Sequence, residues 1–164
     1  MVPGPTPRRP APTVPSRGGS LPVRIERAPP IEAYRFPIED GEADLVLAKS
    51  LMTHLLEEES RHYLREMRRA LRPGRAAVVT AFLFELFEPA AADGAPVRVA
   101  FPFADASGGV RWRSRSRPAS AVAYAKPLFV EMVEAAGLHV QWHWPGYYPG
   151  TARPTGQDVL LIGH

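Results

Sequence analysis

A pair of histidines near the C-terminus is the first feature of this sequence that could do chemistry. His139 and His143 stand four residues apart in "HVQWHW", and no carboxylate lies nearby to complete a metal site. That spacing would place both side chains on one face of a helix. The segment alternates like a strand, however, in which positions four apart share a side but lie about 13 Å from each other. We therefore predict no metal site.

An arginine run, "RWRSRSRP" at residues 111–118, is the second such feature. Four arginines and Trp112 within eight residues could contact phosphates and stack on a base. The run follows "DASGG", so a solvated loop is the interpretation that we prefer. The sequence has no cysteine and no G-x-S-x-G motif, which excludes thiol chemistry and argues against a serine hydrolase.

The composition fits one globular domain, with 45% hydrophobic and 23% charged residues in a chain of 164. Arginine outnumbers lysine 18 to 2, a bias that we attribute to coding composition, so nucleic acid is not an expected partner. No apolar run approaches the roughly 20 residues that span a bilayer, and no secretory signal is recognisable. We expect a cytoplasmic protein without membrane contact.

The first thirty residues have a different composition from the rest. Nine of the 19 prolines lie in residues 1–30. Such a segment cannot bury enough apolar surface to offset its chain entropy. We predict a disordered tail or a non-native leader there, in which Val23 and Ile25 allow one short strand, and a structured domain over residues 31–164.

The next segment predicts a strand, a helix and a second strand. The apolar run "DLVLA", residues 44–48, is typical of a strand buried on both faces. Residues 55–71 have a helical period that ends at Pro73 and Gly74. "AAVVTAF", residues 76–82, is a second buried strand, and a right-handed crossover makes the two strands parallel neighbours. The apolar stripe of the helix is expected to contain Leu56, Tyr63, Leu64, Met67 and Leu71.

The remaining chain completes an α/β pattern. Residues 85–120 read as an excursion over the edge of the sheet, because they lack a clear period. Residues 126–138 predict a helix that stops at Gly137, and residues 139–144 and 157–164 predict two more strands. The predicted fold class is therefore α/β, a partial sheet with flanking helices.

This order of elements resembles the C-terminal half of a class I S-adenosylmethionine (SAM) dependent methyltransferase. Three sequence segments support the resemblance: "FPIEDGEADLVLAKSLMTHL" around the fourth strand, "YLREMRRALRPG" in the next helix and turn, and "GQDVLLIG" in the final strand. The resemblance covers residues 31–164. It implies a Rossmann-like sheet with strands four to seven of the family, and SAM as the methyl donor.

The resemblance also implies part of a cofactor site. Glu32 and Ala33 match a loop in which a carboxylate accepts a hydrogen bond from the adenine amino group and a backbone N–H donates to the ring. The alternative for Glu32 is a solvated side chain in a loop. Ala48, Lys49 and Ser50 match the end of the fourth strand, at the carboxyl edge where open α/β sheets bind ligands. Lys49 departs from the family pattern, because its charge is unfavourable beside the cationic sulfonium unless it points away.

His54 matches the family's histidine in the loop that follows this strand. The match implies a general base for the methyl acceptor, while a packing or capping histidine is the alternative. Tyr34, Tyr147 and Tyr148 could line an acceptor site or pack in the ordinary way.

The family's Gly-rich loop has no counterpart in the sequence. That loop follows the first strand and lets the backbone approach SAM closely. The one candidate, "SRGGS" at residues 16–20, follows no apolar strand, so we interpret it as a linker. Two smaller departures are Ala43, where an aromatic is usual, and Arg75, where a second glycine is common and positive φ would be strained. Without the first strands, residues 44–48 would form an exposed apolar edge.

Two functions follow from these expectations. The first is a methyltransferase-family protein whose full-length form transfers a methyl group from SAM to a small molecule or another polar oxygen or nitrogen acceptor. Because methyl transfer requires both walls of the pocket, we expect no or very weak activity from this truncated chain. The alternative is a non-catalytic methyltransferase-like module that binds a protein partner through its exposed sheet edge.

Overall fold

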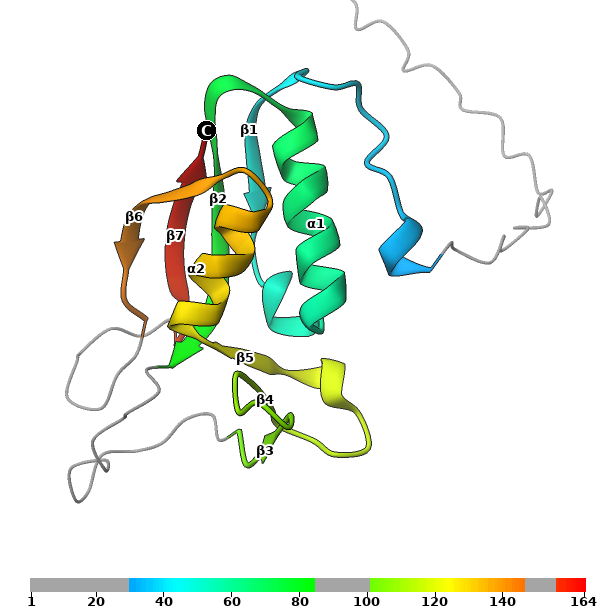
Figure 1. Ribbon diagram of the computed structural model, residues 1–164, viewed down its shortest axis with the longest axis vertical. Coiled ribbons are helices and arrows are strands. Elements are labelled where there is room, and N and C mark those ends of the chain that lie inside the picture. The colour runs from blue at the N-terminus through cyan, green and yellow to red at the C-terminus, as the bar shows by residue number, and fades with distance from the viewer. Residues whose placement is uncertain (1–29, 85–100, 147–155) are drawn as a thin grey trace, which may run out of the picture.

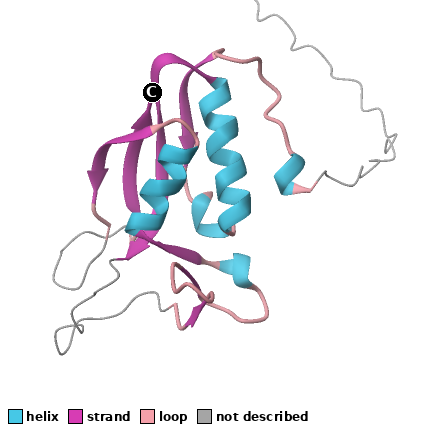
Figure 2. Ribbon diagram, in the orientation of Figure 1, coloured by secondary structure: helices cyan, strands magenta, loops and turns pink. Residues whose placement is uncertain are grey.

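The computed structural model describes residues 30–84, 101–146 and 156–164, and Figures 1 and 2 show two helices packed against a curved sheet. Predictions for the tail, its short strand, the linker at residues 16–20, Tyr147 and Tyr148 lie outside these residues. None of the helices described is long and apolar enough to cross a membrane. The elements in chain order are η1 (Ile31–Ala33), β1 (Ala43–Ala48), η2 (Met52–His54), α1 (Glu57–Ala70), β2 (Leu71–Phe84), β3 (Phe103–Ala104), β4 (Val110–Trp112), η3 (Pro118–Ser120), β5 (Val122–Ala125), α2 (Lys126–Ala135), β6 (His139–Trp144) and β7 (Asp158–Gly163).

The sheet is built around β2. β1 pairs with β2 in parallel, and β7 pairs antiparallel with the same stretch of β2, so these two neighbours lie on opposite sides of it. β6 then pairs antiparallel with β7. The resulting order, β1-β2-β7-β6, confirms the predicted α/β class and the predicted parallel pair joined by a helix.

A second, smaller set of strands continues from the end of β2. Phe82 to Phe84 pair in parallel with β5, which pairs antiparallel with β4, and β4 pairs with β3. The sequence predicted only an excursion here and no strand at residues 122–125. Four residues, all of them buried, are too short a segment for a period to be read.

Both helices pack on the same face of the sheet. Leu64 and Met67 of α1 and Met132 and Val133 of α2 belong to one core cluster with the sheet. Burial alternates along β2, where Ala77, Val79 and Ala81 are buried and the residues between them are half-buried. The core therefore lies between this face and the two helices, while no helix of the described residues covers the opposite face (Figure 1).

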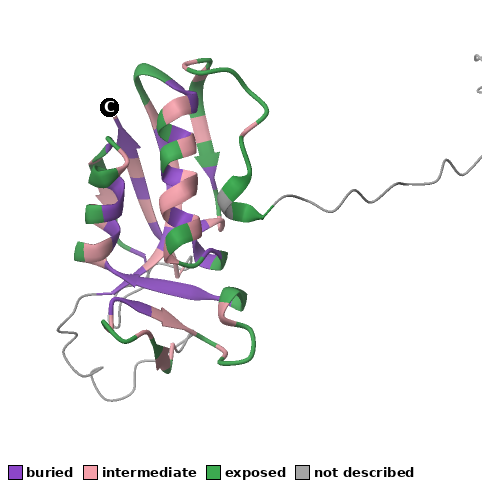
Figure 3. Ribbon diagram, turned by 45° about the vertical axis from the view of Figure 1, so that its right-hand side comes forward, coloured by how far each residue is buried: buried purple, intermediate pink, exposed green. Residues whose placement is uncertain are grey.

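Two predictions about β1 and α1 are wrong in detail. β1 is not buried on both faces, because Leu45 and Leu47 are exposed. Figure 3 shows the ribbon coloured by burial. The helix ends at Ala70 rather than at Pro73, because Leu71 is already extended, with φ of −68° and ψ of 131°, and begins β2. Leu56 precedes the helix and is exposed. Among the described residues, β1 pairs with β2 alone.

The predicted turn chemistry can be checked at three positions. Gly137 stops α2 with φ of 77°, as expected. Gly74 has φ of 75°, whereas Arg75 does not have positive φ. The strain considered for Arg75 is therefore absent, because Gly74 takes up the left-handed conformation of this turn.

Candidate functional site

The chain turns sharply at the carboxyl end of β1. Ser50 has φ of 55°, the only positive φ of a non-glycine residue in the part of the chain described. Its N–H donates to Oγ1 of Thr80 at 2.7 Å, and its carbonyl accepts the hydroxyl of Thr53 at 2.9 Å. A left-handed serine costs about 1 kcal/mol, so these two hydrogen bonds hold a conformation that the residue would otherwise avoid.

Gln157, just before β7, ties this turn to the neighbouring strands. Its side-chain oxygen accepts the hydroxyl of Thr80 at 2.6 Å, and its amide group lies within 3.3 Å of Oγ of Ser50. Ala48 beside this cluster is buried and Lys49 is exposed. The structure thus places Ala48, Lys49 and Ser50 at the carboxyl edge of parallel strands, the position at which open α/β sheets bind ligands.

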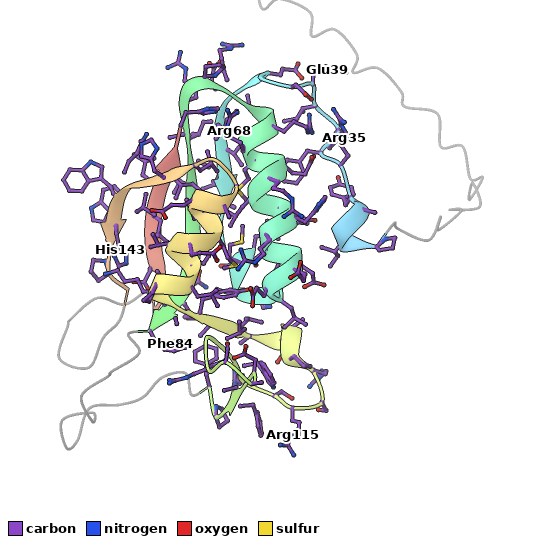
Figure 4. All side chains as sticks on the ribbon, viewed as in Figure 1. Arg35, Glu39, Arg68, Phe84, Arg115 and His143 are labelled. Carbon is purple, nitrogen blue, oxygen red and sulfur yellow. The ribbon has the colours of Figure 1, made fainter. Side chains whose placement is uncertain are left out.

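A buried carboxylate lies at the same edge, at the start of β7. Oδ1 of Asp158 accepts from Nε2 of His143 at 2.7 Å and from the N–H of Gly146 at 3.2 Å, and Oδ2 accepts from the N–H of Leu83 at 3.1 Å. Figure 4 shows His143 on β6, close to this end of the sheet. The expectation that no carboxylate lies near His143 was wrong, because antiparallel pairing of β6 and β7 brings Asp158 to it.

His54, the candidate general base, lies at the end of η2 and is exposed. Its Nδ1 is 3.0 Å from the carbonyl oxygen of Ala119. A carbonyl can only accept, so Nδ1 carries the proton and Nε2 of the neutral ring keeps its lone pair. The geometry therefore fixes the tautomer that a general base working through Nε2 requires.

Tyr124 fixes the position of η2 against β5. Its buried hydroxyl donates to the carbonyl of Leu55 at 2.6 Å and lies 2.8 Å from Oγ of Ser60. Burial raises the pKa of this phenol well above its usual value. Sequence patterns did not reveal this contact, since Tyr124 lies in the unpredicted strand β5, far along the chain from Leu55 and Ser60.

Glu32 and Ala33 lie in η1, which packs against α1 rather than against β1. Tyr34 stacks on Tyr63, with ring centroids 6.4 Å apart, and its carbonyl accepts from Nε2 of His62 at 2.7 Å. The N–H of Ala33 already donates to the carbonyl of Pro30 at 2.9 Å. Figure 1 shows η1 clear of the end of β1. The structure thus does not bring the expected adenine loop together with residues 48–50.

The loop after η1 is clamped to α1 by an ion pair. Glu66 accepts the N–H of Phe36 at 2.8 Å and pairs with Arg69 at 2.8 Å. Arg69 also donates to the carbonyls of Phe36 and Ile38 and pairs with Asp40. The Arg69 guanidinium holds the pKa of Glu66 below its usual value, because it hydrogen-bonds the charged form.

The arginine run is only partly a loop, contrary to the prediction. Arg111 and Trp112 belong to β4, and the Arg111 guanidinium lies 3.9 Å from the ring centroid of Phe84. Arg115 lies 5.5 Å from the ring centroid of Phe103, at the outer end of the small strands (Figure 4). Stacking on these rings is a sufficient role for both side chains.

Residues 24–79 match a protein-family model described as a methyltransferase domain. The match covers about a third of the chain and includes β1, η2, α1 and the first part of β2. It therefore contains the turn at Ser50 and the candidate base His54.

Several solved structures share part of this arrangement. The mitomycin 7-O-methyltransferase is 16% identical, with a TM-score of 0.49 over 82% of this chain and 32% of that one. A SAM-dependent methyltransferase of Leishmania major is 10% identical, with a TM-score of 0.48 over 80% and 42%. The 1,6-didemethyltoxoflavin-N1-methyltransferase of Burkholderia thailandensis is 15% identical, with a TM-score of 0.49 over 81% and 47%. The chain spans a third to a half of the length of these structures, and likenesses of this degree do not assign an activity.

Proposed function

We propose that this chain carries one wall of the SAM site of a methyltransferase, formed by Ala48, Lys49 and Ser50. The observation that carries the proposal is the strained turn at Ser50. It stands at the carboxyl end of a parallel strand, within the segment that matches the methyltransferase-domain family. Backbone strain held by surrounding hydrogen bonds is typical of binding sites.

The residues present at this wall fit the cofactor in part. Ala48 is small and buried, so a ligand could approach the backbone at the end of β1. Ser50 and Thr80 supply hydroxyl groups at the same edge. Lys49 is the poorest fit, since a positive charge next to a sulfonium is repulsive; its exposure is compatible with an ammonium group directed into solvent.

SAM would supply the methyl group, and the acceptor would be a polar oxygen or nitrogen of a small molecule. His54 would take the acceptor's proton at Nε2, because Nδ1 is already occupied by the carbonyl of Ala119. Positioning of acceptor and sulfonium requires a second wall. Since η1 does not reach residues 48–50, we expect weak cofactor binding and little or no methyl transfer by this chain.

A second candidate function rests on the unpaired edge of β1. Among the residues described, β1 has a single strand partner, so its other edge offers free N–H and C=O groups to a strand of another protein. A non-catalytic module of this kind would bind the N-terminal half of a methyltransferase. Recovery of such a half in a pull-down, with no binding of SAM by either half alone, would favour this function.

Titration of the chain with SAM and with its neutral product, S-adenosylhomocysteine (SAH), followed by ¹⁵N NMR, tests the first proposal. We expect saturable shifts centred on Lys49 and Ser50, with dissociation constants in roughly the millimolar range. Lys49→Gln should strengthen binding of SAM relative to SAH. Arg113→Gln, at an exposed position just after β4, serves as the charge control. Shifts that avoid residues 44–54 would contradict the proposal.

A further inference from the structure

The turn that holds His54 also carries a cation. Nδ1 of His54 lies 3.0 Å from the carbonyl oxygen of Ala119, which belongs to η3. Arg117 is the residue just before η3, and its own carbonyl accepts the N–H of Ser120 at 3.0 Å. One hydrogen-bonded turn, residues 117–120, therefore supports the candidate base and carries Arg117.

The loop that contains this turn is closed by the backbone. The N–H of Arg113 donates to the carbonyl of Ala121 at 3.0 Å, which joins the residue after β4 to the residue before β5. Pro118 is the first residue of η3, and its ring fixes φ there. η3 also contacts both η2 and β4. These contacts fix the backbone of Arg117 relative to His54.

The positive charge of Arg117 is not matched by an acid. Residues 111–121 contain four arginines and no aspartate or glutamate. Among the described residues none of these four arginines has an ion pair, whereas Arg61 and Arg69 of α1 each pair with two carboxylates. The side chain of Arg117 is exposed and has no ring contact in the described part of the chain. Guanidinium groups that gather without acids create a positive potential that attracts anions.

A guanidinium recognises a particular class of chemical group. Its N–H donors form a planar fork that matches the two oxygens of a carboxylate or of a phosphate. The fork has no acceptor atom, so a neutral hydroxyl or amide gains much less from it than an anion does. A small molecule with a nucleophilic hydroxyl or amino group and an acidic group could therefore use His54 and Arg117 together.

A small anion fits these surroundings better than a nucleic acid does. A single nucleic-acid strand binds along a positively charged groove that continues over several nucleotides. Here the first turn of α1, which follows η2, contains Glu57, Glu58 and Glu59, and Glu58 is exposed. Their carboxylates would repel a row of phosphates that continued past His54. A single acidic group at Arg117 does not require that continuation.

We propose that Arg117 binds a carboxylate or phosphate group of the methyl acceptor, while His54 takes the proton of the hydroxyl or amino group that is methylated. The inference rests on the proposed function of His54 and narrows its substrates to small acidic molecules. Arg117 determines specificity in this account, since it binds the acceptor and takes no part in proton transfer.

Titration of the full chain with para-hydroxybenzoate, followed by ¹⁵N NMR, tests this inference without SAM. The matched probe is para-hydroxybenzamide, which has nearly the same shape and the same hydroxyl group but no charge. We expect the acid to shift the signals of His54 and of residues 117–120, with an affinity roughly three- to tenfold that of the amide. Added salt should reduce this preference, because the contact is exposed to solvent.

Three variants show whether the preference depends on Arg117. Arg117→Gln should bind the acid and the amide equally, and Arg117→Lys should retain part of the preference, because it keeps the charge without the fork. Arg65→Gln removes the same charge from an exposed position on α1 and should retain the full preference. The spectrum of each variant without a probe reports whether it is folded.

Four results would overturn the inference. The first is equal affinity of the natural chain for the acid and the amide, and the second is a preference that survives Arg117→Gln. The third is a preference that shifts residues 117–120 but not His54. The fourth is binding of a single-stranded oligonucleotide to these residues at a lower concentration than the acid requires, which would favour nucleic acid. Failure of the proposed SAM wall is distinguishable, because it is seen as shifts that avoid residues 44–54 when SAM is added.

Discussion

Asp158 accepts a 2.7 Å hydrogen bond from Nε2 of His143, although the two residues are 15 positions apart in the sequence. The same carboxylate accepts from the backbone N–H groups of Leu83 and Gly146. The carboxylate of Asp158 therefore joins the end of β2 to the end of β6. Gly146 cannot be replaced by a residue with a side chain without movement, because a Cβ there would lie 2.5 Å from the backbone of Gln157.

Replacing Asp158 by asparagine should destabilise the fold by roughly 1–3 kcal/mol. The amide nitrogen that replaces one oxygen can no longer accept a hydrogen bond, which leaves a buried donor without a partner. Urea unfolding measures the change. The control is Asp44→Asn, whose exposed carboxylate pairs with Arg72 and Arg75 and should contribute under 1 kcal/mol. Equal effects of the two substitutions would contradict a stabilising role for the buried hydrogen bonds of Asp158.

Ser50 offers a test of the strained turn through two substitutions. Both Ser50→Gly and Ser50→Ala remove the hydroxyl, but only glycine adopts φ of 55° without cost. The glycine variant should therefore be more stable than the alanine variant by roughly 1 kcal/mol. Thermal unfolding of the pair gives this difference directly, and equal stabilities would show that the turn is not strained.

Tyr124→Phe should lower the free energy of unfolding by roughly 1–2 kcal/mol, because the carbonyl of Leu55 loses its buried donor. The control is Tyr34→Phe, which alters an exposed tyrosine whose role lies in ring stacking and should change stability little. Hydrogen exchange of η2 should also accelerate in Tyr124→Phe. Unchanged exchange there would argue that other contacts hold η2 against β5.

The Glu66–Arg69 pair predicts how stability depends on pH. The pKa of Glu66 is lowered in the folded state, so its contribution is fully present above the ordinary glutamate pKa of about 4.3 and is lost as the pH falls through the lowered value. Urea unfolding in this range should show a steeper loss of stability for the natural chain than for Glu66→Gln. If the free energy of unfolding depends on pH equally in both proteins, protonation of Glu66 is not linked to folding.

Sequence patterns predicted the parts of the fold that follow from local periodicity. The strand at residues 139–144 was predicted with its bounds, and β1, β7 and both helices within a few residues. The glycine that stops α2 follows from backbone freedom. β2 was predicted as a buried strand over residues 76–82, whereas it runs from Leu71 to Phe84 and its burial alternates. Burial of β1 was predicted wrongly, because an apolar run does not say whether anything covers each face.

The candidate site was predictable only in part. Ala48, Lys49 and Ser50 lie at the end of β1, which an apolar run predicts, and their role toward SAM stays a prediction. The partnership of His143 with Asp158 was missed, since it depends on the pairing of β6 with β7. The hydrogen bond of Tyr124 with Leu55 joins residues far apart in the chain, so it leaves no periodic signal in the sequence.

Photo-crosslinking of SAM labelled in its methyl group, followed by tryptic mapping, tests the proposed wall most directly. Cleavage after Arg35, Lys49 and Arg61 separates residues 36–49 and 50–61 from the rest of the chain. The account predicts that label at millimolar SAM concentrates in these two peptides and is suppressed by excess SAH. Label confined to other peptides, or label that SAH does not reduce, would contradict a SAM wall at Ala48, Lys49 and Ser50.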